Sequence, residues 1–523
     1  MLKVLVTDPL NEKGVAILKK AGFDVDEKGK LSPAELAKVI GKYDVLVVRS
    51  GTKATAEVIE KADRLKLIGR AGVGLDNIDV EKATEKGIIV MNAPEGNTTS
   101  AAEHAIGMMF ALARNIPRAN ASVKEGKWER KKFMGAELYG KTLGIVGLGR
   151  IGRRVAQMAR AIGMKTLAYD PYISDQDARA LDIGLVGIEG LCRKSDFVTF
   201  HIPLTDETYH LVGKKELALM RKGVRIINCA RGGVLDEAAL NEGIVKGKVA
   251  GAALDVYEKE PPEDSPLLMH DGVVMTPHLG ASTKEAQVNV AVSLAEQIVE
   301  AFSRKIVRNA VNLPRVDAEF MEQFGGYLPL AEKMGRLLCQ MEEGKVRELE
   351  ISYRGEIVNS DISMVRNSVL KGFLDGRKDV SVVNAPLVMK ESGIQLKERR
   401  AESAGEFSTL VTVKARGRKT HSASGTLIRK DVPRIVGIDG FPVDAVPEGI
   451  LLVSFNEDKP GIMGHIGTVL GKQKVNIASM TLGRKKRGGP ALTVLNLDQE
   501  ISGAVVKKIE EFPAINLVKL VKL

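Results

Sequence analysis

The segment 143–153 constrains the fold of this chain more than any other. A short apolar run is followed there by Gly147, Gly149 and Gly152, and the next residues predict a helix over 153–162. In this G-x-G-x-x-G pattern the first glycine permits a tight turn, the second lets a pyrophosphate approach the backbone, and the third lets the helix pack closely. Phosphates would lie at the helix N-terminus, where free N–H groups favour negative charge. The segment therefore predicts a strand–turn–helix unit that binds a dinucleotide.

A second apolar strand follows that helix and ends at Asp170. A carboxylate at this position accepts hydrogen bonds from the ribose hydroxyls of the adenosine and repels a 2′-phosphate. Pro171 comes next, where an enzyme specific for NADP would more often have an arginine. The pattern therefore favours NAD as the cofactor.

Short apolar runs alternate with helical patterns through the first half of the chain. Ser32 and Pro33 predict the start of a helix that extends to about residue 40. Regular alternation of this kind predicts parallel sheets covered by helices. Strands are expected over 4–6, 45–48, 67–68 and 88–90, helices over 98–115 and 282–302, and a second strand–helix series over 141–277.

Changes of pattern divide the rest of the chain. Pro314 and the acidic residues after it predict a linker, β-rich stretches follow, and Pro447 marks another boundary. We expect an α/β chain with two Rossmann-like, doubly wound domains, one of them discontinuous, followed by an α+β intervening domain and a small C-terminal domain. The expected divisions are a substrate-binding domain over 1–97 with 281–310, an NAD-binding domain over 98–280, an intervening domain over 311–447 and a regulatory domain over 448–523.

The charge of the chain bears on its partners. The formal net charge is +11, which suits an enzyme of small anions because a positive field concentrates them. The basic residues are scattered, and the tight run 484–487 precedes two glycines and a proline, a pattern that predicts a solvated turn. We therefore expect no nucleic-acid partner.

The sequence gives no sign of secretion, membrane insertion or a metal site. It has no run of about 18 apolar residues and no signal-peptide pattern. Cys192, Cys229 and Cys339 lie far apart and offer neither a disulfide framework nor a zinc site. We expect a cytoplasmic protein with buried thiols and no metal.

Three later segments carry side chains suited to hydride transfer. Oxidation of a hydroxy acid needs a base for the hydroxyl proton and a fixed cation for the anionic oxygens. Histidine suits the first task because its pKa lies near working pH, and arginine suits the second because its charged fork binds a carboxylate at two points. A nearby glutamate would orient the imidazole and raise its pKa. The segments are 228–237 with Arg231, 253–262 with Asp255, Glu258 and Glu260, and 276–281 with His278.

These segments, in this order after the glycine motif, resemble the D-isomer-specific 2-hydroxyacid dehydrogenases. The resemblance implies Arg231 as the arginine that binds substrate, His278 as the acid/base and Glu260 as the partner of His278. Glu258 remains the alternative partner, although Glu260 directly precedes a Pro-Pro pair, as the family's catalytic glutamate does. The other histidines are expected to be structural or exposed: His104, His201, His210, His270, His421 and His465.

The resemblance also extends the cofactor site. It implies that Asp255 lies at the nicotinamide end of the cofactor. The cofactor contacts expected from the glycine motif and from the resemblance are Gly147, Gly149, Arg150, Ile151, Gly152, Asp170, Cys229, Ala230, Asp255, His278 and Gly280.

Two arginines of the first domain bear on the substrate. Arg49 and Arg70 end or follow predicted strands, and open α/β sheets bind ligands at the carboxyl ends of their strands. With Arg231 they suit a substrate that carries both a phosphate and a carboxylate, with possible help from the basic residues 130–132. The alternative is that Arg49 and Arg70 form surface salt bridges.

The segments 70–79, 97–104 and 127–135 look like those of the phosphoglycerate dehydrogenases in particular. Val73 departs from some members, which have threonine there. The resemblance implies NAD-dependent oxidation of 3-phospho-D-glycerate to 3-phosphohydroxypyruvate, the first step of serine biosynthesis. The alternatives are a glyoxylate or hydroxypyruvate reductase and, from another class, an NAD-sensing corepressor; neither accounts for the patterned, apolar segment 311–523.

The C-terminal segment is similar to an ACT domain, a βαββαβ module that binds small amino acids where two copies meet. The similarity implies L-serine as an allosteric effector, bound by Asn456, Asp458 and Asn476. A carboxylate and an amide suit an amino acid chemically, but a docking domain without a ligand remains the alternative. The segment 311–447 matches the extra domain of the long-form enzymes, and a homotetramer is expected by analogy.

Overall fold

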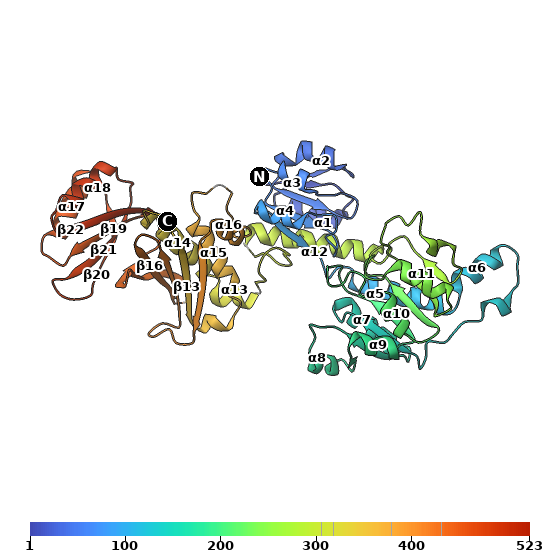
Figure 1. Cartoon of the computed structure of the whole chain (residues 1–523). Helices are drawn as coiled ribbons and strands as arrows, with labels where there is room; N and C mark the ends of the chain where they lie inside the picture. The colour runs from blue at the N-terminus through green and yellow to red at the C-terminus, as the bar shows by residue number, and fades with distance from the viewer. Residues whose placement is uncertain (305, 317, 378, 430) are drawn as a thin grey trace.

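The structure is a computed structural model that describes residues 1–304, 306–316, 318–377, 379–429 and 431–523. The described residues form separate sheets along an elongated chain, with the ACT-like sheet at one end (Figure 1). Among these residues, no helix is long and apolar enough to span a membrane. The expected fold classes are confirmed, whereas the domain boundaries stay a prediction.

The first sheet is parallel, with the strand order β2-β1-β3-β4-β5. The predicted strands β1, β3, β4 and β5 are confirmed. The edge strand β2 has mostly exposed residues and no apolar pattern, so the sequence offered no signal for it. The strands are β1 (Lys3–Val6), β2 (Asp24–Glu27), β3 (Val45–Val48), β4 (Leu67–Arg70) and β5 (Ile89–Asn92). The helices between them are α1 (Glu12–Lys20), α2 (Pro33–Val39), α3 (Ala56–Glu60) and α4 (Val80–Glu85).

Helix α12 (Lys284–Ser303) belongs to the core of the first sheet although it follows the second sheet in the chain. Val290, Leu294 and Ile298 on its apolar face are buried with residues of β1, β3 and β4. The helix also packs on α1, where a Cβ at Gly14 would lie 2.7 Å from the carbonyl oxygen of Ala291. The chain therefore leaves the first domain after β5 and returns to its core through α12.

The second sheet is also parallel, with the order β12-β11-β10-β9-β6-β7-β8. Its order reverses at β6, which lies between β9 and β7, and ligands of open α/β sheets bind at such a switch point. The strands are β6 (Thr142–Val146), β7 (Lys165–Tyr169), β8 (Gly184–Leu185), β9 (Phe197–Phe200), β10 (Val224–Asn228), β11 (Val249–Leu254) and β12 (Val273–Met275). The helices are α5 (Thr98–Ala113), α6 (Ile116–Lys124), α7 (Arg150–Ala161), α8 (Asp175–Ala180), α9 (Ile188–Lys194), α10 (Lys214–Leu219) and α11 (Glu237–Val245).

Two helix predictions in this region need correction. Helix α7 begins at Arg150 rather than at residue 153, because Gly149 already serves as its N-cap and Gly152 lies within its first turn. The helix predicted over 98–115 ends at Ala113, and Asn115, in the left-handed conformation, separates α5 from α6.

The third sheet is mixed, with the order β14-β13-β15-β16-β17-β18. Its strands are β13 (Glu348–Gly355), β14 (Gln395–Ala401), β15 (Thr409–Arg416), β16 (Thr420–Ile428), β17 (Val432–Ile438) and β18 (Phe441–Ala445). The helices are α13 (Ala318–Phe324), α14 (Tyr327–Met341), α15 (Ser363–Phe373) and α16 (Ala385–Glu391). Glycines weaken the helical signal of α14 and α15, yet one of them allows close packing: a Cβ at Gly372 would overlap the carbonyl oxygen of Glu332.

The fourth sheet is antiparallel, with the order β20-β21-β19-β22. Its elements follow the expected βαββαβ order, which is thereby confirmed. They are β19 (Ile450–Glu457), α17 (Ile462–Lys472), β20 (Ile477–Arg484), β21 (Pro490–Leu497), α18 (Gly503–Glu510) and β22 (Ile515–Lys522).

The basic run 484–487 is exposed, as expected of a turn. The prediction is wrong for Arg484, which ends β20 and pairs with Asp458. Lys485 lies over the ring of Phe441, with Nζ 4.6 Å from the ring centroid. The turn therefore joins the fourth sheet to β18 of the third.

Replacing Gly372 by alanine should destabilise the third domain by about 1–3 kcal/mol, because the added methyl group collides with the backbone of α14. Gly471, the matched position before the last residue of α17, has open space at its Cβ. Gly471→Ala should be neutral or stabilising by up to about 1 kcal/mol. Calorimetric unfolding of both variants measures the difference, and equal stability of the two would contradict the packing described.

Candidate active site

The glycine turn after β6 has the shape that a dinucleotide requires. Gly147 has a φ of 94°, a left-handed conformation that favours glycine, and a Cβ there would lie 2.6 Å from the carbonyl oxygen of His201. A Cβ at Gly152 would overlap the carbonyl oxygen of Gly147. At Gly149, by contrast, the space is open, and this N-cap leaves the first N–H groups of α7 without a side-chain cap. The turn therefore presents a backbone cradle for phosphate groups.

Asp170 lies beside this turn, directly after β7. Its Oδ2 accepts a hydrogen bond from the backbone N–H of Leu148 at 2.8 Å, and its Oδ1 accepts one from Tyr172 at 2.9 Å. These bonds fix the carboxylate next to the glycine turn, where the predicted ribose contact requires it.

Arg150 extends from the start of α7 toward the first sheet and pairs with Glu95 at 3.6 Å. Ile151 packs against the core of the second sheet.

Cys229 and Ala230 follow β10 on the way to Arg231. The side chain of Asn228 fixes this turn by accepting from the N–H of Ala230 at 3.1 Å and donating to the carbonyl of Arg231 at 2.9 Å. Burial, and then the charge of Asp255, raises the pKa of the Cys229 thiol. The thiol is therefore protonated near neutral pH, and the predicted contact at this position is one with an uncharged group.

His278 and Glu260 form a pair, with Nδ1 of His278 3.0 Å from Oε2 of Glu260. The bond to Glu260 raises the pKa of His278. Burial alone would raise the pKa of Glu260, but the hydrogen bond and charge of His278 outweigh burial and lower it. Because Nδ1 is bound to Glu260, Nε2 is the nitrogen that can exchange a proton with a substrate. His278 has a φ of 56°, a conformation that is uncommon outside glycine and that clusters at functional sites.

Glu258, the alternative partner, lies elsewhere. Its Oε1 is 3.0 Å from Nε2 of His210 and accepts from the N–H of Glu237 at 3.1 Å. The geometry thus pairs Glu260, and not Glu258, with His278.

Arg231 and Arg70 approach each other from the two sheets. Nε of Arg231 lies 3.2 Å from Oδ2 of Asp76. Any side chain at Gly72 would overlap the guanidinium group of Arg70, and one at Gly74 would overlap that of Arg231. This loop of the first domain therefore cradles both guanidinium groups.

The charges of the arginines act on one another. Burial, and then the positive charge of Arg231, lowers the pKa of Arg70 to about 10. Arg70 donates from Nε to Oδ1 of Asn77 at 3.3 Å, and Arg49 donates from Nη1 to the carbonyl oxygen of Pro9 at 3.1 Å. Both acceptors are neutral, so these hydrogen bonds of Arg49 and Arg70 are not the surface salt bridges of the alternative. Arg231 alone among the three pairs with a carboxylate of the described residues, that of Asp76, so the cluster keeps an excess of positive charge that favours an anion.

Asp255 is bound to the segment that carries His278, and its place at the nicotinamide end of the cofactor stays a prediction. It is fully buried, and its carboxylate accepts from Oγ1 of Thr276 at 2.6 Å and from the N–H groups of Leu279 and Gly280 at 2.7 and 2.9 Å. Burial alone would raise the pKa of Asp255, but hydrogen bonds, first from His104, lower it. Asp255 therefore holds the backbone just after His278 and the side chain of Thr276 just before it.

His104, which we expected to be structural or exposed, belongs to this arrangement. Its Nε2 lies 3.2 Å from Oδ1 of Asp255 and 3.2 Å from Oγ1 of Thr276. The residue comes from α5, far from both partners in the chain, so no spacing in the sequence marks it. It ties α5 to the segment that carries His278.

The expected effector residues lie at two places in the fourth domain. Asn456 is buried and accepts from Oγ1 of Thr493 at 3.2 Å. Asp458 accepts from Nη1 of Arg484 at 2.6 Å and from the N–H of Gly488 at 2.9 Å, and these bonds, first that of Gly488, lower its pKa. Asn476 donates to Asp498 at 2.7 Å. An amino acid would therefore compete with partners that these side chains already have.

Family models match three stretches of the chain. Residues 106–280 match the NAD binding domain of D-isomer specific 2-hydroxyacid dehydrogenases. Residues 323–439 match the intervening domain of D-3-phosphoglycerate dehydrogenase, and residues 449–514 match an ACT domain.

Relatives of known name are similar over the full chain. The D-3-phosphoglycerate dehydrogenase of Methanocaldococcus jannaschii is 45% identical, and that of Bacillus subtilis is 43% identical, each with 100% of both chains covered. The solved structure of D-lactate dehydrogenase from Aquifex aeolicus, complexed with NAD and lactic acid, is 29% identical with a TM-score of 0.54 and covers 60% of this chain and 100% of its own.

Replacing Glu260 by glutamine should lower the pKa of His278, because the charged acceptor that stabilises the imidazolium is lost. An NMR titration of the labelled histidine measures the shift. Glu263→Gln, an exposed carboxylate in the same loop, is the matched control and should leave the titration unchanged. An unaltered pKa of His278 in Glu260→Gln would contradict the pairing.

Proposed function

The chain belongs to the D-3-phosphoglycerate dehydrogenases, in the long form with an intervening domain and an ACT domain, and we propose that it oxidises 3-phospho-D-glycerate to 3-phosphohydroxypyruvate with NAD. The observation that carries the proposal is the 45% identity over the full length of both chains. The cluster of arginines supports it, because the substrate has a phosphate and a carboxylate to neutralise.

The residues at the glycine turn are those that would hold the cofactor: the N–H groups at the start of α7 take the pyrophosphate, and Asp170 takes the ribose hydroxyls. When bound, the nicotinamide supplies the hydride acceptor. Asp255 is fully buried among protein donors, so its contribution to this site is to hold the segment 276–280 in place. Cys229, Ala230 and Gly280 are proposed as further cofactor contacts, and hydrogen bonds to Asn228 and Asp255 fix the backbone of Ala230 and Gly280.

Acid–base chemistry falls to His278 and Glu260. As the substrate is oxidised, Nε2 of neutral His278 takes the proton of the substrate hydroxyl, and the carboxylate of Glu260 stabilises the imidazolium that forms. In the reverse direction, the same imidazolium returns the proton to the carbonyl oxygen. Arg231 binds the substrate carboxylate through its fork and orients the carbon that loses the hydride.

Substrate selection falls to Arg49 and Arg70. Arg49 directly follows β3 and Arg70 ends β4, and the charges of both Arg49 and Arg231 act on Arg70. A phosphate brings two negative charges to this cluster and relieves its internal repulsion, whereas glyoxylate would leave part of the charge unpaired. Family membership and this charge together disfavour the reductase and corepressor alternatives.

The fourth domain is proposed to regulate the enzyme. L-serine, the end product of the route that this reaction begins, is the proposed effector. It would bind where two copies of the domain meet, with Asn456 and Asp458 from one copy and Asn476 from the other, in place of the bonds to Arg484 and Asp498. Pairing of ACT domains and of cofactor domains would give a homotetramer. We also propose a reducing cytoplasm as the location, since the cysteines among the described residues are unpaired.

The purified protein should produce NADH from 3-phosphoglycerate, but not at a comparable rate from D-lactate or glycolate, and L-serine should slow the reaction. The absorbance of NADH measures the rate with each substrate and with added L-serine. Lack of turnover with 3-phosphoglycerate would overturn the main proposal, and turnover insensitive to serine would remove the proposed effector.

In the same assay, His278→Ala should abolish turnover while NADH still binds, because the acid/base is lost and the glycine turn is intact. Fluorescence of bound NADH measures the binding. Retained turnover would contradict the role of His278.

A further inference from the structure

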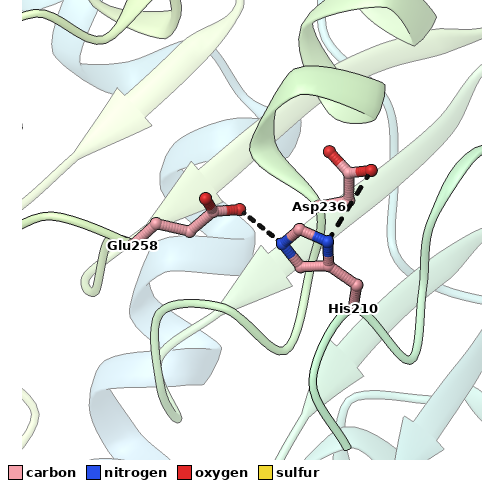
Figure 2. A group of neighbouring side chains, drawn as sticks. All are labelled: His210, Asp236 and Glu258. Carbon is pink, nitrogen blue, oxygen red and sulfur yellow. Dashed lines mark hydrogen bonds and ion pairs between the residues drawn. The ribbon is translucent and has the colours of Figure 1, made fainter.

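A second histidine lies close to the loop that carries Glu260. His210 is positioned between two carboxylates, with Nε2 3.0 Å from Oε1 of Glu258 and Nδ1 4.0 Å from Oδ2 of Asp236 (Figure 2). The imidazole stacks on the ring of Tyr209, with centroids 4.0 Å apart. The backbone N–H of His210 donates to the carbonyl of Gly233 at 2.7 Å, which fixes the residue against the segment after Arg231.

Glu258 and Glu237 are bound to each other twice. Oε1 of Glu258 accepts from the N–H of Glu237 at 3.1 Å, and Oε1 of Glu237 accepts from the N–H of Glu258 at 2.7 Å. Asp236 caps α11 by accepting from the N–H of Ala239 at 2.8 Å. Three segments far apart in the chain are thus joined: the loop before α10, the start of α11, and the loop 257–260.

This junction lies directly beside the proposed catalytic groups. Gly232, next to Arg231, is so close to the loop that a Cβ would overlap the carbonyl oxygen of Tyr257. The N–H of Tyr257 donates to Oε1 of Glu260 at 3.3 Å, and its hydroxyl donates to the carbonyl of Thr276 at 2.8 Å. A movement of residues 257–258 would therefore displace Glu260 and loosen its contact with His278.

By composition alone, His210, Asp236 and Glu258 could also hold a metal ion. Their hydrogen bonds argue against it. Both carboxylates accept N–H groups from the first turn of α11, the positive end of the helix dipole, where a cation is disfavoured. The group is better suited to bind protein donors than a cation.

We propose that His210, Glu258 and Glu237 form a clamp that positions Glu260, and through it His278, for proton transfer. The clamp acts on the reaction through Glu260, so its three members are positioning residues. The inference rests on the proposed function in taking Glu260 and His278 as the acid–base pair. Charge links the clamp to that pair as well: burial, and then the charges of Glu258 and Glu260, raise the pKa of Glu237.

Glu258→Ala removes the acceptor of both His210 and Glu237. We expect kcat with 3-phosphoglycerate to fall about 10- to 100-fold, while KM and the Kd of NADH change less than about threefold, because misplacement of a catalytic group affects the chemical step. Glu258→Gln keeps an oxygen acceptor and should restore kcat to within about threefold of the wild type. Lys259→Ala is the matched control from the same loop, since Lys259 is exposed and pairs with Asp264.

Two further measurements separate the possible outcomes. Thermal unfolding shows whether each variant folds, and an NMR titration of His278, which needs no substrate, should show a lower pKa in Glu258→Ala than in Lys259→Ala. If the wild type fails to oxidise 3-phosphoglycerate, the proposed function falls, and the titration still tests the clamp.

Wild-type kcat and an unaltered His278 titration in Glu258→Ala would overturn the clamp. So would a Glu258→Gln variant as slow as Glu258→Ala. A stoichiometric zinc or manganese ion in the purified wild type, lost in Glu258→Ala and needed for turnover, would replace the clamp by a cation site.

Discussion

Three guanidinium groups from two separate sheets share one site, and the folded chain must hold them against their mutual repulsion. Arg49 follows a strand of the first sheet, Arg70 ends one, and Arg231 follows a strand of the second. Helix α12, which follows the last strand of the second sheet in the chain, packs into the core of the first. The cost of the arrangement is visible in Arg70, whose pKa is lowered to about 10 by burial and by Arg231. On the proposed function, the anionic substrate removes this repulsion, so the packing that brings the arginines together would also select the ligand.

The proposed acid–base pair is supported from two sides. Asp255, fully buried, accepts from the N–H groups of Leu279 and Gly280 after His278 and from the hydroxyl of Thr276 before it, and is itself bound by His104 of α5. On the other side, the bonds between Glu258 and Glu237 hold the loop of Glu260. Catalysis by proton transfer depends on distances held to fractions of an ångström, and both supports consist of charge-assisted bonds to backbone N–H groups, which are strong and directional.

The parts of this site that could be predicted from the sequence are those whose residues lie close together in the chain. Gly147, Gly149 and Gly152 act within one turn, and Glu260 and His278 stand in short motifs that the family resemblance identifies. The supporting contacts carry no such signal: His104 and Thr276 are 172 residues apart, and His210 and Glu258 are 48 apart. Only the folded chain brings them together. Strand β2 likewise has no apolar pattern, because it lies at the edge of its sheet. Gly372 weakens the helical pattern of α15, and only the packing of α15 on α14 explains why a glycine is there.

The central claim is that the arginines of the first sheet recognise the phosphate of the substrate. The most direct test is kcat/KM of Arg49→Gln for 3-phosphoglycerate and for D-glycerate, which lacks the phosphate. Loss of a charge-assisted bond should lower the value for 3-phosphoglycerate by about 10- to 100-fold, while the value for D-glycerate changes less than about threefold. Equal losses for both substrates would contradict the claim.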